Sequence, residues 1–173
     1  MTIELRDERP GDEDAIRAMT DAAFDGMPFS QGDEGAIVDR LRRAGALAVS
    51  LVALEDGVPV GHAAFSPVTI EGEGGRWLGL GPLSVRPGHQ RRGIGLALLN
   101  EGLNRLRAGG ATGCVLVGDP GYYGRFGFRT HPGLTYSDVP QRYVQALQFG
   151  TPRAVAGAIH FHPSFHPSSS GDA

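Results

Sequence analysis

The sequence predicts one domain of the α/β (α+β) class, a mixed sheet with helices on both faces, and three observations support this. Apolar runs of strand length alternate with segments in which apolar residues recur every three or four positions. A strand, a glycine-rich turn and a long helix follow one another between Leu80 and Gly109. The pair Gly81-Pro82 interrupts the fourth predicted strand, so we expect the sheet to splay there.

The first part of the chain predicts a short strand and two helices. Residues 3–5 form the strand, and Pro10-Gly-Asp12 begins a helix. Apolar side chains line one side of this helix: Ala15, Ile16, Met19, Ala22, Ala23 and Phe24. The second helix is expected over residues 33–43, with Gly45 as its stop. The segment 25–32 between the helices is then a loop, which we expect to border a substrate site.

A hairpin is predicted next. Residues 47–54 and 58–65 are apolar runs that flank Glu55-Asp56-Gly57. Asp-Gly between two such runs is a strong signal for a tight antiparallel turn. The second strand of the pair is open to extension as far as Ile70, before the next glycine-rich turn.

The fourth strand and the helix that follows it form the segment on which the functional interpretation depends. The strand spans residues 77–85, and Gly81-Pro82 predicts a bulge in it because proline cannot donate to the ladder. The segment Gln90-Arg-Arg-Gly-Ile-Gly95 opens the helix, and Gly109-Gly110 stops it. One face of the helix carries recurring leucines: Leu96, Leu99, Leu103 and Leu106.

Beyond this helix the pattern predicts a strand and a short helix. The strand spans residues 114–117. Asp119 can cap the short helix and Pro120 can be its first residue, and Gly127 ends it.

The C-terminal third is expected to complete the sheet. Residues 143–149 and 156–161 have the apolar character of strands. Residues 163–173 are rich in Ser, Pro and Gly, so we expect a mobile tail there and a single domain over residues 1–162.

Composition argues against several function classes. The chain has 173 residues, 16 basic against 19 acidic side chains and a net charge of −3, which argues against general nucleic-acid binding. The single cysteine, Cys114, excludes an internal disulfide and a cysteine-based zinc site. There is no membrane-length apolar run and no signal-peptide pattern near Met1, so we expect a cytoplasmic protein.

The glycine-rich turn is suited to binding a diphosphate. The first amides of a helix have no partner inside it and carry the positive end of its dipole. Gly93 and Gly95 remove side chains that would obstruct an anion, and Arg91 and Arg92 add positive charge. A Walker loop requires Lys and Ser or Thr after its second glycine, and a Rossmann fingerprint requires Gly or Ala where this chain has Leu98. Neither motif fits.

The segment instead resembles the acyl-CoA-binding motif of the GNAT superfamily of N-acetyltransferases. Gln90-Arg-Arg-Gly-Ile-Gly95 matches the pattern Gln-x-x-Gly-x-Gly between a strand and a helix. A second match follows downstream, where Tyr123-Gly-Arg-Phe-Gly-Phe128 resembles the family's Tyr-x-x-x-Gly-Phe. The order of elements over residues 3–128 follows that family, and residues 118–128 are similar to its bacterial YhbS-type subgroup.

The resemblance implies a GNAT fold and transfer of an acetyl group from acetyl-CoA to a primary amine, by direct attack in a ternary complex. It implies that strand amides at Leu83, Ser84 and Val85 hold the pantetheine arm and receive the developing oxyanion. The turn supplies the remaining expected cofactor contacts: Gln90, Arg91, Arg92, Gly93, Ile94, Gly95 and Leu96. No metal is expected, the acceptor is expected to be a small-molecule or peptide amine, and homodimer formation is left open.

Tyr123 is the residue that the resemblance implies for catalysis, with its phenol next to the CoA sulfur to protonate the departing thiolate. The alternative is an aromatic packing pair with Tyr122, and Tyr122 is also a candidate for the catalytic position. The family's usual Asn and Ala upstream of this tyrosine are absent around Leu116 and Asp119.

The general base is less determined by the sequence. Glu34, at the head of the second predicted helix, is the candidate for the base. Alternatively, Glu34 is a solvated glutamate stabilised by the helix dipole, and the amine loses its proton through water. His62 is either a pocket-facing residue or a hydrogen-bonded core histidine, and we expect the core histidine. His160 and His162 share one face of a strand, with His166 beyond, but we expect no metal site because we expect no carboxylate or cysteine nearby.

Two alternative functions remain open from the sequence. A protein with this motif can bind CoA without turnover, as a sensor or interaction module, and an enzyme can use a longer acyl-CoA. A core position for Tyr123 or a closed acceptor cleft would favour the binding module. Acceptor specificity is expected in the loops and the C-terminal strands.

Overall fold

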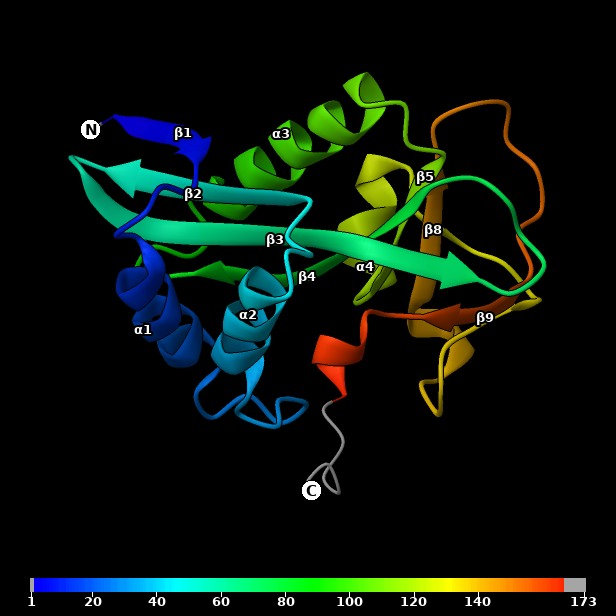
Figure 1. Cartoon of the computed structure of the whole chain (residues 1–173), viewed down its shortest axis with the longest axis horizontal. Helices are drawn as coiled ribbons and strands as arrows, with labels where there is room; N and C mark the ends of the chain where they lie inside the picture. Colours follow the sequence, from blue (N-terminus) through cyan, green and yellow to red (C-terminus); the bar gives the residue numbers. More distant parts are fainter. Residues whose placement is uncertain (1, 167–173) are drawn as a thin grey trace.

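The chain folds into a twisted mixed sheet with helices on both faces, and the computed structural model describes residues 2–166 (Figure 1). The strands are β1 (Ile3–Asp7), β2 (Val49–Glu55), β3 (Val58–Ile70), β4 (Trp77–Val85), β5 (Gly113–Val117), β6 (Arg129–Thr130), β7 (Leu134–Thr135), β8 (Val144–Gln148) and β9 (Gly157–His160). Their order in the main sheet is β1-β2-β3-β4-β5-β8-β6, and β9 pairs with β3 and β7. Strands β4 and β5 pair in parallel, whereas their other main-sheet neighbours pair antiparallel, which confirms the predicted mixed sheet.

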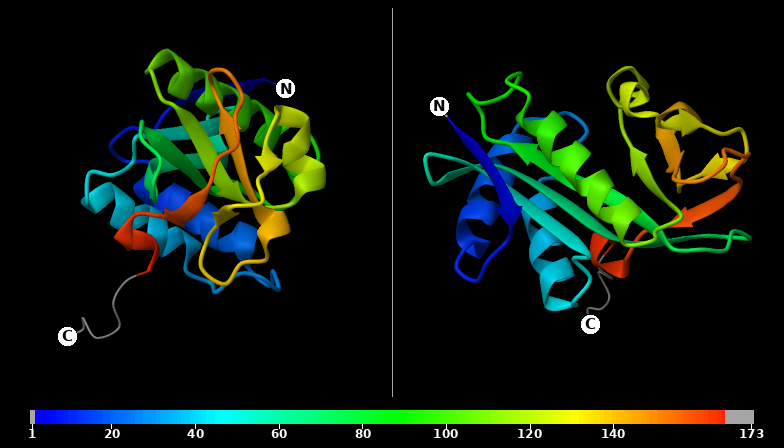
Figure 2. Two further views of the ribbon diagram at one scale, coloured as in Figure 1. Left: turned by 90° about the vertical axis from the view of Figure 1, so that its right-hand side faces the viewer. Right: turned by 90° about the horizontal axis from the view of Figure 1, so that it is seen from above.

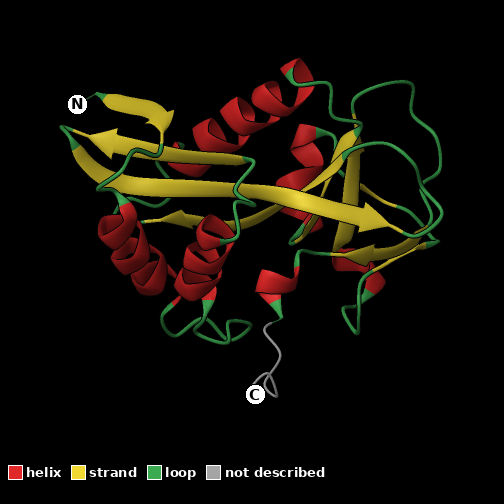
Figure 3. Cartoon of the chain, in the orientation of Figure 1, coloured by secondary structure: helices red, strands yellow, loops and turns green. Residues whose placement is uncertain are grey.

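Helices cover the two faces of this sheet (Figures 2 and 3). The structure places α1 (Glu13–Phe24) and α2 (Glu34–Arg43) on one face and α3 (Ile94–Ala108) on the other, while the short α4 (Pro120–Tyr123) follows β5. Helix α3 packs closely on the sheet at Gly102. A Cβ at this position would be 2.2 Å from the ring of Phe65, so a larger residue would not fit without a shift. None of the described helices is long and apolar enough to cross a membrane.

The first helix differs in detail from its prediction. It begins at Glu13, three residues after Pro10, and the Asp12 carboxylate accepts hydrogen bonds from Arg6 and from the Arg9 amide instead of capping the helix. Its buried side is formed by Ile16, Met19, Thr20 and Ala23, whereas the predicted Ala22 is exposed. The second helix and the loop between the two helices lie where the sequence predicts them.

The predicted hairpin between β2 and β3 is confirmed. Glu55 pairs with Val58, so the loop contains only Asp56 and Gly57. Both loop residues have positive φ, 52° and 81°, as a tight turn between antiparallel strands requires. Strand β3 extends to Ile70.

The sheet opens where the sequence predicts an interruption. Ala63 pairs with Leu83 and Phe65 with Leu80, so one residue of β3 faces the two residues Gly81-Pro82 of β4 as a bulge. The parallel ladder between β4 and β5 ends at Gly79, opposite Val115. Beyond that point β4 stays paired with β3 alone, which confirms the predicted splay.

The first residues of the expected C-terminal tail have a defined structure, which partly corrects the prediction. Residues Pro163–Phe165 form a 3-10 turn, and Ser164 is buried. The carbonyl oxygen of Ser164 accepts a hydrogen bond of 2.9 Å from Arg40 Nε, and Phe165 packs against Ile37 and Leu41 of α2. The described fold therefore extends past residue 162 as far as residue 166, and the rest of the expected tail, 167–173, lies outside the described residues.

Candidate active site

The open edge of β4 presents two backbone amides toward the gap beside β5. The amide of Arg86 donates to the carbonyl oxygen of Val60 at 2.8 Å, so position 86 is hydrogen-bonded to β3. Hydrogen-bonding direction alternates along an antiparallel strand, so Ser84 also faces β3 while Leu83 and Val85 face the opposite side. Strand β5 no longer pairs with β4 at this level. The amides of Leu83 and Val85 therefore point in the opposite direction from the amide of Ser84. The sequence alone predicted the same role for all three residues.

The start of α3 lies next to this edge and is open to an anion. The first intrahelical hydrogen bond runs from Ala97 N to Gly93 O, at 3.0 Å, so the amides before Ala97 have no partner within the helix. Gly93 has a φ of 84°, and a Cβ there would meet nothing within 4 Å. A Cβ at Gly95 would lie 3.4 Å from Tyr122 Oη and 3.6 Å from Val85 Cγ2. The helix start, the end of β4 and α4 therefore surround one space.

A carboxylate that the sequence does not mark is paired with two side chains of the turn. Glu55 Oε2 lies 2.5 Å from Arg92 Nη2, and Glu55 Oε1 lies 3.1 Å from His89 Nε2. The hydrogen bond from Arg92 holds the pKa of Glu55 below its ordinary value. On the inner side of the turn, Gln90 Nε2 donates to Val85 O at 3.3 Å. No local signal marks Glu55, because its contacts come from a turn that is distant in sequence.

Helix α4 presents the two tyrosines. Asp119 caps it as predicted, with Oδ1 accepting from Gly121 N at 3.0 Å, and the amides of Tyr122 and Tyr123 both donate to Asp119 O. The Tyr123 ring is partly buried against the core and lies 6.1 Å from the ring of Phe128. Burial raises the pKa of Tyr123 to about 12, so its hydroxyl is protonated at neutral pH and carries a proton that it can donate.

Glu34, His62 and Cys114 have environments that differ from one another. Glu34 is the first residue of α2 and accepts a hydrogen bond of 2.7 Å from the Ser30 hydroxyl. His62 is fully buried, its Nε2 lies 2.8 Å from Ser50 Oγ, and burial lowers its pKa to about 4. The prediction of a hydrogen-bonded core histidine is thus confirmed for His62. Cys114 is buried as well, and burial raises the pKa of its thiol.

The C-terminal histidines are not gathered around one point. His160 Nε2 lies 2.5 Å from Glu71 Oε2, so the assumption that no carboxylate is near was wrong. His162 Nδ1 accepts from the Ser164 amide, and His166 pairs with the Tyr136 hydroxyl. Among residues 2–166 no group of three or more His, Cys, Asp or Glu side chains is arranged to hold a metal ion.

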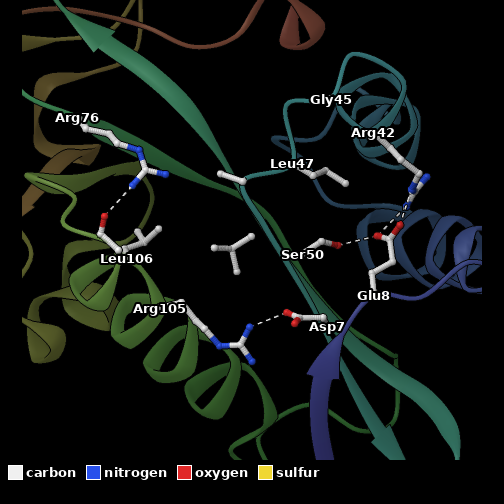
Figure 4. A pocket seen from close by; sticks show the side chains of 12 residues that line it. Asp7, Glu8, Arg42, Gly45, Leu47, Ser50, Arg76, Arg105 and Leu106 are labelled. Carbon is white, nitrogen blue, oxygen red and sulfur yellow. Dashed lines mark hydrogen bonds and ion pairs between the residues drawn. The ribbon is translucent and has the colours of Figure 1, made fainter.

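A polar hollow of about 670 Å³ lies at the other end of α3 (Figure 4). It is lined by residues that include Arg105 and Gly109, at the C-terminal end of that helix. Two of its arginines form ion pairs with carboxylates that also line it, because Arg105 bonds to Asp7 and Arg42 bonds to Glu8. This hollow is separate from the space at the helix start.

The comparisons with known proteins agree with this geometry. Residues 15–128 match the Acetyltransferase (GNAT) family. The uncharacterized N-acetyltransferase YhbS of Escherichia coli K12 is 32% identical over 94% of this chain and 98% of its own length.

Two solved structures are also similar to this chain. The first is a GNAT family acetyltransferase from Brucella melitensis in complex with acetyl-CoA, at 49% identity and a TM-score of 0.83, covering 95% of this chain and 98% of that one. The second is Escherichia coli YhbS in complex with CoA, at 31% identity and a TM-score of 0.85, covering 94% and 91%. With the open β4 edge and the glycine turn, these matches show that the chain belongs to the GNAT family of N-acetyltransferases.

Proposed function

We propose that this protein transfers an acetyl group from acetyl-CoA to a primary amine, by direct attack of the amine while both substrates are bound. The observation that carries the proposal is the open edge of β4, where the amides of Leu83 and Val85 face the gap beside β5. A relative of 49% identity was solved in complex with acetyl-CoA, which supports the choice of donor.

The residues at the turn fit the diphosphate of CoA. The free amides at the start of α3 point out of the helix, and glycine at positions 93 and 95 keeps side chains away from them. Arg91 is exposed beside them, and Arg92 adds a cation that Glu55 partly compensates. The proposed contacts are Leu83, Val85, Gln90, Arg91, Arg92, Gly93, Ile94, Gly95 and Leu96. Ser84 faces β3, so its role in the proposal is to hold that strand in place.

Acetyl-CoA supplies the acetyl group as a thioester. During transfer the amine nitrogen bonds to the carbonyl carbon, the carbon–sulfur bond breaks, the nitrogen loses a proton and the sulfur gains one. The amides of Leu83 and Val85 would donate hydrogen bonds to the carbonyl oxygen as negative charge develops on it. The protonated hydroxyl of Tyr123 would supply the proton to the sulfur, and Glu34 is the candidate that receives the proton of the amine.

Tyr122 is the alternative proton donor, because its hydroxyl lies beside Gly95 at the helix start. A second candidate function also has an observation in its favour. The Tyr123 ring packs against the core beneath α3, as expected of a protein that binds CoA without turnover. An enzyme that uses longer acyl-CoA esters is a variant of the first function.

The direct experiment is an acceptor screen that measures release of CoA thiol together with the mass of the product. Small amines, amino acids and peptides with free N-termini are incubated with acetyl-CoA and the purified protein. The proposal predicts equal amounts of free CoA and of an acetylated amine for at least one class. Tight binding of acetyl-CoA without an acetylated product in any class would favour the binding module instead.

A further inference from the structure

A buried amide side chain on β8 is bonded to the residue that precedes the tyrosine helix. Gln145 is 1% exposed, and its Nε2 donates to the carbonyl oxygen of Gly118 at 2.9 Å. In the sheet it pairs with Leu116 of β5 and with Thr130 of β6. Leu116 belongs to the core cluster beneath α3, against which the partly buried Tyr123 ring packs, so Gln145 lies on the tyrosine side of the sheet.

Gly118 connects this amide to Tyr123. Its own amide donates to Tyr143 O at 2.9 Å, so both polar groups of this residue are held by the β8 side. A Cβ at Gly118 would lie only 2.5 Å from Tyr123 Cε2, which shows that the tyrosine ring rests directly on this backbone. Any shift of the Gly118 peptide must therefore move the ring or open a gap beneath it.

The second polar atom of Gln145 indicates why an amide is present. Its Oε1 is buried and has no hydrogen-bond partner among the described residues. An apolar side chain of similar size would fill the same volume without leaving an oxygen unpaired. The amide is thus unfavourable for packing alone, and the bond to Gly118 is what it contributes.

We propose that Gln145 is a positioning residue. It fixes the Gly118 peptide and thereby places the Tyr123 hydroxyl where it can give its proton to the CoA sulfur. This inference rests on the proposed function of Tyr123, but the position of the ring can be measured without any reaction. The test replaces Gln145 by methionine, which keeps the volume and removes both polar atoms. Gln148→Met is the matched control, because Gln148 lies on the same strand and its Oε1 accepts from the Arg153 amide instead.

The position of the ring is measured by fluorine NMR of protein containing fluorotyrosine. The chain has four tyrosines, and Tyr123→Phe identifies the signal of Tyr123. Gln145→Met should shift or broaden that signal while the signal of Tyr136 stays, and Gln148→Met should change neither. If Gln145→Met does not fold, Gln145→Asn, whose shorter amide draws back from Gly118, takes the same measurements.

Activity is measured in both tyrosine backgrounds. Gln145→Met should lower kcat about tenfold in the wild type with KM for acetyl-CoA unchanged, and should have no further effect in Tyr123→Phe, because coupled residues are not additive. An unchanged Tyr123 signal, or an equal loss of kcat in both backgrounds, would overturn the positioning role. A shifted signal combined with full activity of Tyr123→Phe would support the positioning role and reject the proposed function of Tyr123.

Discussion

Replacing Gly95 by aspartate tests whether the start of α3 holds the diphosphate. The side chain enters the space between the helix start, Val85 and the Tyr122 hydroxyl, where a Cβ finds contacts of 3.4 and 3.6 Å and therefore fits with small adjustments. An aspartate in the first turn interacts favourably with the helix dipole. We thus expect Gly95→Asp to fold and to retain its unfolding temperature within a few degrees.

The expected loss of affinity follows from charge. A carboxylate about 4 Å from a phosphate oxygen is repelled by about 4 kcal/mol at the effective dielectric constant of a protein surface. That energy corresponds to a dissociation constant about a thousand times higher, since each 1.4 kcal/mol is a factor of about ten. Gly95→Asn has nearly the same shape without the charge, so the difference between the two variants isolates the electrostatic part.

Calorimetry measures both variants with two ligands, CoA and a pantetheine fragment that lacks the diphosphate. The weaker binding of Gly95→Asp should appear with CoA and should diminish as the salt concentration rises. The pantetheine fragment should bind the two variants equally. Equal affinity of the Asp and Asn variants for CoA would refute a diphosphate at this helix start.

Three further outcomes are expected. Tyr123→Phe should lower kcat by about 10²–10⁴-fold with acetyl-CoA affinity nearly unchanged, whereas a loss seen only in Tyr122→Phe would move the role to that residue, as steady-state kinetics can show. Glu55→Gln should tighten CoA binding at low salt, since it removes the negative charge beside Arg92, and calorimetry with unchanged affinity would contradict this. The unfolded His62 binds a proton more readily than the buried one, so stability should fall by up to ~3 kcal/mol as pH drops from about 6.5 to about 4. Denaturant titrations between these pH values should show that the free energy of unfolding of His62→Gln lacks the part of this fall that His62 contributes.

The parts of the fold that were predicted depend on local chemistry. Asp56-Gly57 specifies a turn that needs two positive φ angles, and Gly81-Pro82 interrupts a ladder because proline has no donor. The glycine turn and the leucine face of α3 are equally local patterns, although Leu98 is buried in place of the predicted Leu96. Each of these features is therefore readable within a window of a few residues.

The features that were missed depend on contacts between distant segments. Glu55 reaches Arg92 across 37 positions, and Gln145 reaches Gly118 across 27. The turn at Ser164 is held by Arg40, which is 124 positions away. No periodicity or motif encodes such pairs, because only the folded sheet brings their segments together. The same reason explains why the sequence could not separate Ser84 from Leu83 and Val85 by the direction in which their amides point.

A titration with acetyl-CoA, monitored by the amide signals in NMR spectra, tests whether the donor binds at the open edge of β4. We expect the amide signals of Leu83, Val85, Gly93 and Gly95 to shift strongly at saturation. The amide of Ser84, which faces β3, should shift much less and serves as the internal control. Saturation with acetyl-CoA that leaves these four amides unchanged would contradict a donor site at the open edge of β4.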